Sequence, residues 1–281
     1  MESGVARNGE VEIAYEMTGS RDARPLLLSS GLDGQMIGWP DGFCAALADA
    51  GFRVVRYDHR DAGLSTHFTG RKRAYGLTDM IDDMMAVLDA LGWESAHLAG
   101  LSMGGGLIQW AALLHPERVA TLTPISAVPQ YGNPALLFRY IRFPGPFRMA
   151  FRRYGDSRED KKRMLMDVAR ICGARSLPLD EDWLEQVAEE CLRRRYPDPG
   201  SRARQLAAGR GAHLPAGGIA GITQPVLAIS GAEDPLVRPA GGRKIAATVR
   251  NGRFVLVPRM GHMFTEPLWP QLVAEISQHA V

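Results

Sequence analysis

A serine lies between two glycines in the stretch Gly100-Leu101-Ser102-Met103-Gly104, which matches the pattern G-x-S-x-G. An apolar run of strand length, Ala96–Leu101, precedes the serine, and an apolar segment of helix length, Leu107–Leu114, follows it. So tight a turn from strand to helix requires small residues two positions before and after the serine. It also aims the hydroxyl at a helix N-terminus, where free N–H groups favour negative charge. The stretch therefore predicts Ser102 as a nucleophile.

The same glycines are also consistent with a turn that carries no chemistry, or with a phosphate-binding loop. A dinucleotide fingerprint needs G-x-G-x-x-G and a phosphate loop needs Gly-Lys-Ser or Gly-Lys-Thr, and this stretch has neither. A base and an acid at matching places in the fold would favour the nucleophile.

Asp234 and His262 each follow a predicted strand, Pro225–Ser230 and Arg253–Val257 respectively. The carboxyl ends of parallel strands meet at one edge of a sheet, so both side chains are expected on the same edge as Ser102. Serine becomes a good nucleophile when an imidazole takes its proton and a carboxylate orients that imidazole. The chain order serine, acid, histidine is that of a serine hydrolase of this architecture. It predicts a triad of Ser102, Asp234 and His262, with Glu233 as the rival acid.

Such chemistry needs two N–H groups that bind the developing oxyanion. One is expected from Met103, directly after the nucleophile. The other is expected from the loop that follows the buried strand at residues 26–29, where Leu32 is the best candidate.

Predicted strands alternate with predicted helices along the first half of the chain, which indicates a mostly parallel, doubly wound α/β sheet. The polar turn after residue 57 contains Asp58 and Arg60, which are expected to hold that turn by hydrogen bonds. The predicted strands are 11–16 (as an edge strand), 26–29, 52–57 and 119–127, and the predicted helices are 41–50 and a segment that Thr78 caps and Gly92 ends.

Strand-like runs are lacking from about residue 131 to 214, where Ser157 and Asp180 are predicted to cap helices. We interpret this block as an inserted helical cap, with a hydrolase core at 1–130, the cap at 131–215 and the rest of the core at 216–281. Arg193–Arg195 falls in a last helical turn, where a solvated surface is expected. Several aromatic residues are candidates to line a pocket for a flat hydrophobic substrate or to pack within the cap: Tyr131, Phe138, Tyr140, Phe143, Phe147, Phe151 and Trp183.

Composition excludes several functional classes. The net charge of +2 is too small to indicate nucleic-acid binding, and no apolar run has the length of a membrane span. The N-terminus lacks the order of a signal peptide, so a cytoplasmic protein is expected, as a monomer or homodimer. Cys44, Cys172 and Cys191 are expected to be free, packed thiols. The histidines lack metal-ligand spacing, and neither a metal nor a cofactor is expected.

Residues 38–43, 55–66 and 100–104 resemble the α/β-hydrolase superfamily and, more narrowly, the aclacinomycin methylesterases. The resemblance implies an α/β-hydrolase fold and cleavage of a methyl ester on an aromatic polyketide of the anthracycline type, by a Ser-Asp-His triad without a cofactor. One departure is Ser30-Gly31, where that family usually has His-Gly. Asp33 follows close behind, and its role stays open because a carboxylate near an oxyanion is unfavourable.

These features predict a serine esterase that acts on a small hydrophobic ester. The same triad also performs C–C bond hydrolysis, lactone opening and cofactor-free perhydrolysis, and the serine turn is similar to that of cofactor-free haloperoxidases. Dehalogenases and epoxide hydrolases are disfavoured, because they need aspartate in place of Ser102. A hydrolase fold that only binds a ligand is the alternative from another class.

Overall fold

The computed structural model describes residues 1–70, 74–130, 139–142, 152–177, 179–195, 198–209 and 212–280. These residues contain one sheet with the strand order β1-β2-β4-β3-β5-β6-β7-β8. All pairs from β4 to β8 across the sheet are parallel. The strands are β1 (Glu2–Asn8), β2 (Val11–Thr18), β3 (Arg24–Ser29), β4 (Phe52–Tyr57), β5 (Ala96–Leu101), β6 (Val119–Ile125), β7 (Val226–Gly231) and β8 (Gly252–Val257). The predicted doubly wound α/β sheet is confirmed.

The prediction of an edge strand at residues 11–16 is wrong. β2 pairs antiparallel with both β1 and β4, so β1 is the edge strand. β1 lacks an alternating apolar pattern, and Ala6 is its only buried residue, so local periodicity does not reveal it. Its place in the sheet comes from the ladder that it forms with β2.

Helices cover both faces of the sheet. In β3, Leu27 packs on the side of α2 (Leu77–Ala90), α3 (Met103–Leu114) and α8 (Ala240–Thr248), whereas Leu26 and Leu28 pack against α1 (Asp41–Asp49) and α9 (Trp269–His279). This alternation follows from the two-residue period of a strand that is buried on both faces. Short 3-10 helices lie at η1 (Met36–Gly38), η2 (Pro116–Arg118), η4 (Gly218–Gly221) and η5 (Glu266–Leu268).

Two of the three predicted helix caps are correct. The Ser157 hydroxyl accepts from the Asp160 N–H at 3.1 Å, and the Asp180 carboxylate accepts from the Trp183 N–H at 3.0 Å. Thr78 is not a cap, because α2 already begins at Leu77 and Thr78 lies within its first turn. Its first turn is instead closed by the Asp79 side chain, which accepts the N–H of Gly76 at 2.6 Å.

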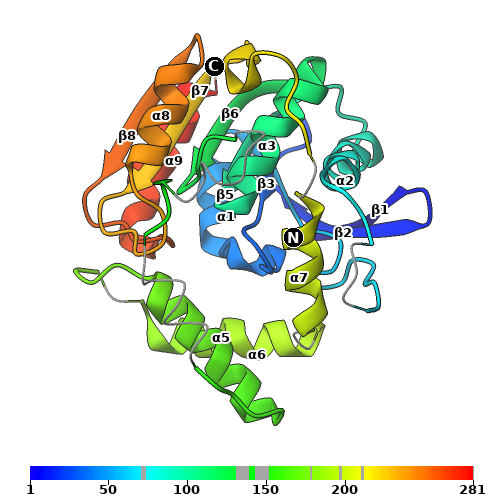
Figure 1. The fold of residues 1–281 in the computed structure, drawn as a ribbon, viewed down its shortest axis with the longest axis vertical. Coiled ribbons are helices and arrows are strands. Elements are labelled where there is room, and N and C mark those ends of the chain that lie inside the picture. Colours follow the sequence, from blue (N-terminus) through cyan, green and yellow to red (C-terminus); the bar gives the residue numbers. More distant parts are fainter. Residues whose placement is uncertain are drawn as a thin grey trace.

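Three helices follow β6 and precede β7: α5 (Arg158–Cys172), α6 (Glu181–Arg194) and α7 (Pro199–Ala208). Figure 1 shows α5 and α6 side by side, away from the sheet and its covering helices, while α7 leads back toward the core. Among the described residues, no helix is long and apolar enough to cross a membrane.

Candidate active site

Ser102 forms the tight turn between β5 and α3 that the sequence predicts. Its φ of 54° and ψ of −112° are rare for a residue with a side chain, because the Cβ crowds the backbone. A Cβ added at Gly100 would overlap the Gly104 carbonyl, and one added at Gly104 would overlap the Ser29 carbonyl. The two glycines therefore allow β5, α3 and β3 to approach one another around the serine.

Hydrogen bonds join the ends of neighbouring strands at this edge of the sheet. The N–H of Ser102, after β5, donates to the Ile125 carbonyl of β6 at 2.9 Å. The N–H of Ser126, after β6, donates to the Ile229 carbonyl of β7 at 2.9 Å. The loops that follow β5, β7 and β8 therefore leave the same carboxyl edge, as the parallel order requires.

Asp234 and His262 form a buried pair on two of these loops. The Asp234 Oδ2 lies 2.9 Å from the His262 Nδ1, while the Asp234 Oδ1 accepts the N–H groups of Leu236 at 2.7 Å and Val237 at 2.8 Å. Burial raises the pKa of Asp234, but His262 and the two N–H groups outweigh it and hold that pKa below its ordinary value. Because an ionised carboxylate only accepts, the His262 Nδ1 carries the proton and its Nε2 is left to act as a base.

Glu233, the rival acid, is bound elsewhere. Its carboxylate accepts the N–H of Ser176 at 2.9 Å and also the Ser176 hydroxyl. Arg259, on the loop after β8, donates to the Ser176 carbonyl at 2.9 Å. The geometry thus favours Asp234 as the partner of His262 and leaves Glu233 as a link to the segment that follows α5.

The loop after β3 passes beside Ser102. A Cβ added at Gly31 would lie 3.5 Å from the Ser102 Cβ. Leu32 is the next residue of this loop, and Met103 is the first residue of α3, whose N–H has no acceptor within its own helix. Of the two residues predicted to supply oxyanion donors, Met103 directly follows Ser102 in the chain, and Leu32 directly follows Gly31, which lies beside Ser102.

His59 forms a hydrogen bond to the first residue of this loop, a role that the sequence does not predict. The buried His59 Nε2 lies 3.0 Å from the Ser30 carbonyl, which can only accept, so this nitrogen carries the proton. Burial lowers the pKa of His59 and keeps the ring neutral. A topological signal was available, because His59 follows β4, whose carboxyl end lies at the same edge of the sheet as Ser102.

Asp58 holds its turn as predicted, whereas the Arg60 side chain fixes that turn to α2. The Asp58 carboxylate accepts the N–H groups of Met36 at 2.7 Å and Leu64 at 2.9 Å. Arg60 binds both oxygens of Asp83 on α2 at 2.6 Å.

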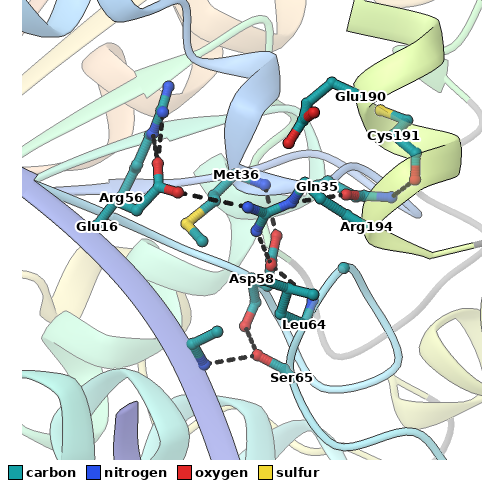
Figure 2. A network of polar contacts seen from close by, with 12 residues as sticks. Glu16, Gln35, Met36, Arg56, Asp58, Leu64, Ser65, Glu190, Cys191 and Arg194 are labelled. Carbon is teal, nitrogen blue, oxygen red and sulfur yellow. Dashed lines mark hydrogen bonds and ion pairs between the residues drawn. The ribbon is translucent and has the colours of Figure 1, made fainter. Parts of the chain in front are cut away.

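The predicted solvated surface at Arg193–Arg195 is wrong for Arg194, whose side chain is only 4% exposed. Figure 2 shows this side chain extending from α6 between Asp58, Glu16 and Gln35. Its guanidinium lies 2.6 Å from the Asp58 Oδ2 and 3.4 Å from the Glu16 Oε1. One helical position away, the Arg193 side chain is 72% exposed. The helix period thus turns Arg194 inward, where it joins α6 to the turn that follows β4.

Replacing Arg194 by methionine is expected to lower the free energy of unfolding by about 3–5 kcal/mol, because the buried Asp58 carboxylate loses its charged partner. Urea unfolding of the wild type and the variant measures this change. Arg193→Met is the matched control, and its unfolding midpoint should stay at the wild-type value. Equal midpoints for the two variants would contradict a buried ion pair.

Most of the predicted pocket aromatics lie outside the described residues, namely Tyr131, Phe138, Phe143, Phe147 and Phe151. Tyr140 is buried and its carbonyl accepts the Arg238 N–H at 2.7 Å, so it packs on the loop after β7. Trp183 is half-buried on α6. The lining of a substrate pocket stays a prediction.

The three cysteines are free thiols, as predicted. Burial raises the pKa of Cys44, Cys172 and Cys191 to about 12 each, so all three are poor nucleophiles. Within the described part of the chain, no three His, Cys, Asp or Glu side chains gather as a metal site.

A family model described as the alpha/beta hydrolase fold matches residues 24–266. The chain belongs to the alpha/beta hydrolase fold family. Its structure is similar to a hydrolase from Pseudomonas aeruginosa PA01, with a TM-score of 0.74 and 25% identity over 99% of this chain and 97% of the other. The fold that the serine motif and strand order predict is thereby confirmed.

Two methylesterases from Streptomyces are similar over nearly their full length. Rhodomycin D methylesterase DauP of Streptomyces sp. (strain C5) is 31% identical over 96% of this chain and 95% of its own. Rhodomycin D methylesterase DnrP of Streptomyces peucetius is 28% identical over 99% of this chain and 98% of its own. These relatives agree with the predicted resemblance to anthracycline methylesterases.

Proposed function

We propose that this alpha/beta hydrolase is a serine esterase that cleaves a methyl ester of a polycyclic aromatic acid, an aromatic polyketide in particular. The observation that carries the proposal is the buried Asp234–His262 hydrogen bond of 2.9 Å, at the sheet edge that bears Ser102 on its strained turn. The similarity to two rhodomycin D methylesterases supports the ester as substrate.

In the proposed mechanism, Ser102 Oγ attacks the ester carbonyl while His262 Nε2 takes its proton. The N–H groups of Leu32 and Met103 bind the oxyanion of the tetrahedral intermediate. His262 then returns the proton to the leaving methoxide oxygen, which departs as methanol. A water molecule, deprotonated by the same nitrogen, then attacks the acyl-serine. As the second tetrahedral intermediate collapses, the imidazolium returns this proton to the departing Ser102 Oγ, and the acid is released. Asp234 holds the Nδ1–H tautomer and stabilises the imidazolium throughout.

We further propose that residues 131–215 form a cap that bounds the substrate site. Support comes from the contacts of this segment with loops at the carboxyl edge of the sheet, where Ser102 lies. Arg194 of α6 binds Asp58, after β4, and Ser176 binds Glu233, after β7. A hydrophobic pocket between cap and core would favour substrates with large apolar faces.

A panel of methyl esters, from methyl acetate to methyl esters of polycyclic aromatic acids, tests the proposal through release of methanol and free acid. Each additional 100 Å² of apolar surface buried in the pocket contributes roughly 2.5 kcal/mol, which corresponds to about 70-fold in kcat/KM. We therefore expect kcat/KM to rise steeply with ring number. Stoichiometric binding of these esters with no acid released would instead indicate a binding protein.

A further inference from the structure

The loop beside Ser102 contains a turn in an unfavourable conformation. The Gly34 N–H donates to the Gly31 carbonyl at 3.1 Å, which closes a four-residue turn. Its third residue is Asp33, with a φ of 61°, while Leu32 before it keeps a negative φ. This is the pattern of a type II turn, whose third position favours glycine because left-handed φ crowds a side chain. An aspartate at this position is therefore stabilised by other contacts.

Those contacts come from α7. The Gln205 Oε1 accepts the N–H of Asp33 at 2.8 Å, and the Ser201 hydroxyl donates to the Asp33 Oδ1 at 3.1 Å. Ser201 and Gln205 lie four residues apart, so they share one face of the helix, and both are nearly fully buried at 2% and 3% exposure. The side chain of Asp33 is thus bound by the helix, and burial raises its pKa, which disfavours a charge beside the oxyanion.

Helix α7 is also fixed to the core, through Gln205 and Arg204. The Gln205 Nε2 donates to the Arg60 carbonyl at 3.1 Å. Arg204 binds both oxygens of the buried Asp61, at 2.7 and 2.8 Å. The segment that contains Arg60 and Asp61 also carries His59, which binds the Ser30 carbonyl. The loop at residues 30–34 is therefore held at both ends, by His59 at Ser30 and by Gln205 at Asp33.

We propose that Gln205 is a positioning residue for ester hydrolysis. By accepting the Asp33 N–H it fixes the Leu32–Asp33 peptide and with it the turn. The Gly34 N–H to Gly31 carbonyl bond of that turn orients the Gly31–Leu32 peptide, and hence the direction of the Leu32 N–H at the oxyanion. This inference rests on the proposed function, because it assigns Gln205 to the oxyanion-binding loop of that reaction. Such donors must be held within about 0.5 Å of their working position.

Gln205→Leu removes both polar atoms while keeping a side chain of similar size. We expect kcat to fall about 10- to 100-fold, which is less than the loss of a whole oxyanion donor. KM should stay within about twofold, because the turn acts on the transition state rather than on substrate binding. Leu206→Gln, on the adjacent and 57% exposed position of the same helix, is the control and should keep wild-type kcat.

A second substitution tests the turn itself. In the double variant Asp33→Gly/Gln205→Leu, glycine favours the left-handed turn without help from α7, so kcat should recover several-fold relative to Gln205→Leu. If Gln205→Leu does not fold, the pair Asp33→Ala and Asp33→Gly decides. Both lose the Ser201 contact, but only alanine resists the positive φ, so alanine should have the lower kcat.

If the wild type cleaves the ester and Gln205→Leu has the same kcat, the inference is overturned. A variant in which only KM rises would also overturn it. Equal kcat values for Asp33→Ala and Asp33→Gly would also overturn it. A wild type that cleaves no ester would instead remove the proposed function, so the two failures are distinguishable.

Discussion

Replacing Ser102 by alanine is expected to lower kcat for ester hydrolysis by a factor on the order of 10⁶. The variant loses the atom that attacks the carbonyl, and His262 then has no hydroxyl to deprotonate. Substrate affinity should change little, because one oxygen is removed from a preformed site. Steady-state kinetics on the best ester of the panel measures the loss.

Ser126→Ala is the matched control for this variant. Ser126 follows β6, the strand next to β5, and also has a positive φ, of 48°. Its buried hydroxyl has no hydrogen-bond partner among the described residues. Activity within about threefold of wild type is expected for Ser126→Ala, since no proposed catalytic contact is lost. Wild-type turnover by Ser102→Ala would exclude Ser102 as the nucleophile.

Replacing Asp234 by asparagine is expected to lower kcat about 10⁴-fold at neutral pH, with the fold retained. The asparagine amide can donate to the His262 Nδ1, which stabilises the tautomer whose proton is on Nε2. In that tautomer Nε2 cannot take the proton from Ser102. The measurement is kcat at pH 7, with circular dichroism to verify that the variant is folded.

Glu233→Gln separates the two acids. The Glu233 carboxylate binds Ser176 rather than His262, so we expect activity within a few-fold of wild type. A large loss in Glu233→Gln combined with an active Asp234→Asn would reverse the assignment.

The pH dependence of stability offers a related check on Asp234. Its pKa lies below the ordinary value of 3.8, so the folded state favours the ionised form. This stabilisation is fully present above the unfolded-state pKa of about 4 and is lost as the pH falls through the folded value. Acid unfolding caused by Asp234 should therefore begin below about pH 4.

Sequence patterns predicted the features that local chemistry determines. Ser102 needs glycines on both sides of its turn, so its motif is visible in five residues. Asp234 and His262 were found because each follows an apolar strand, and parallel strands end at one edge. Ser157 and Asp180 cap helices through contacts with residues three positions ahead, which are also local.

The features that sequence analysis missed depend on long-range contacts. Arg194 is buried because Asp58, 136 residues away in sequence, lies opposite it. Gln205 likewise meets Asp33 across 172 residues. The start of α7 had a local signal, Asp198 followed by Pro199, since the Asp198 side chain accepts the Gly200 N–H at 2.8 Å. The contact of α7 with the loop at residues 30–34, however, cannot be predicted from the local sequence of α7 or of that loop.

The proposed mechanism requires that Ser102 becomes acylated during turnover. Rapid acid quenching of the wild type with a p-nitrophenyl ester, followed by digestion and mass spectrometry, tests it directly. We expect the acyl group on Ser102 within the peptide that contains residues 100–104, at an occupancy that matches the burst of p-nitrophenol. Steady hydrolysis of the ester with Ser102 unmodified at every time point, or with the acyl group on another residue, would contradict the claim.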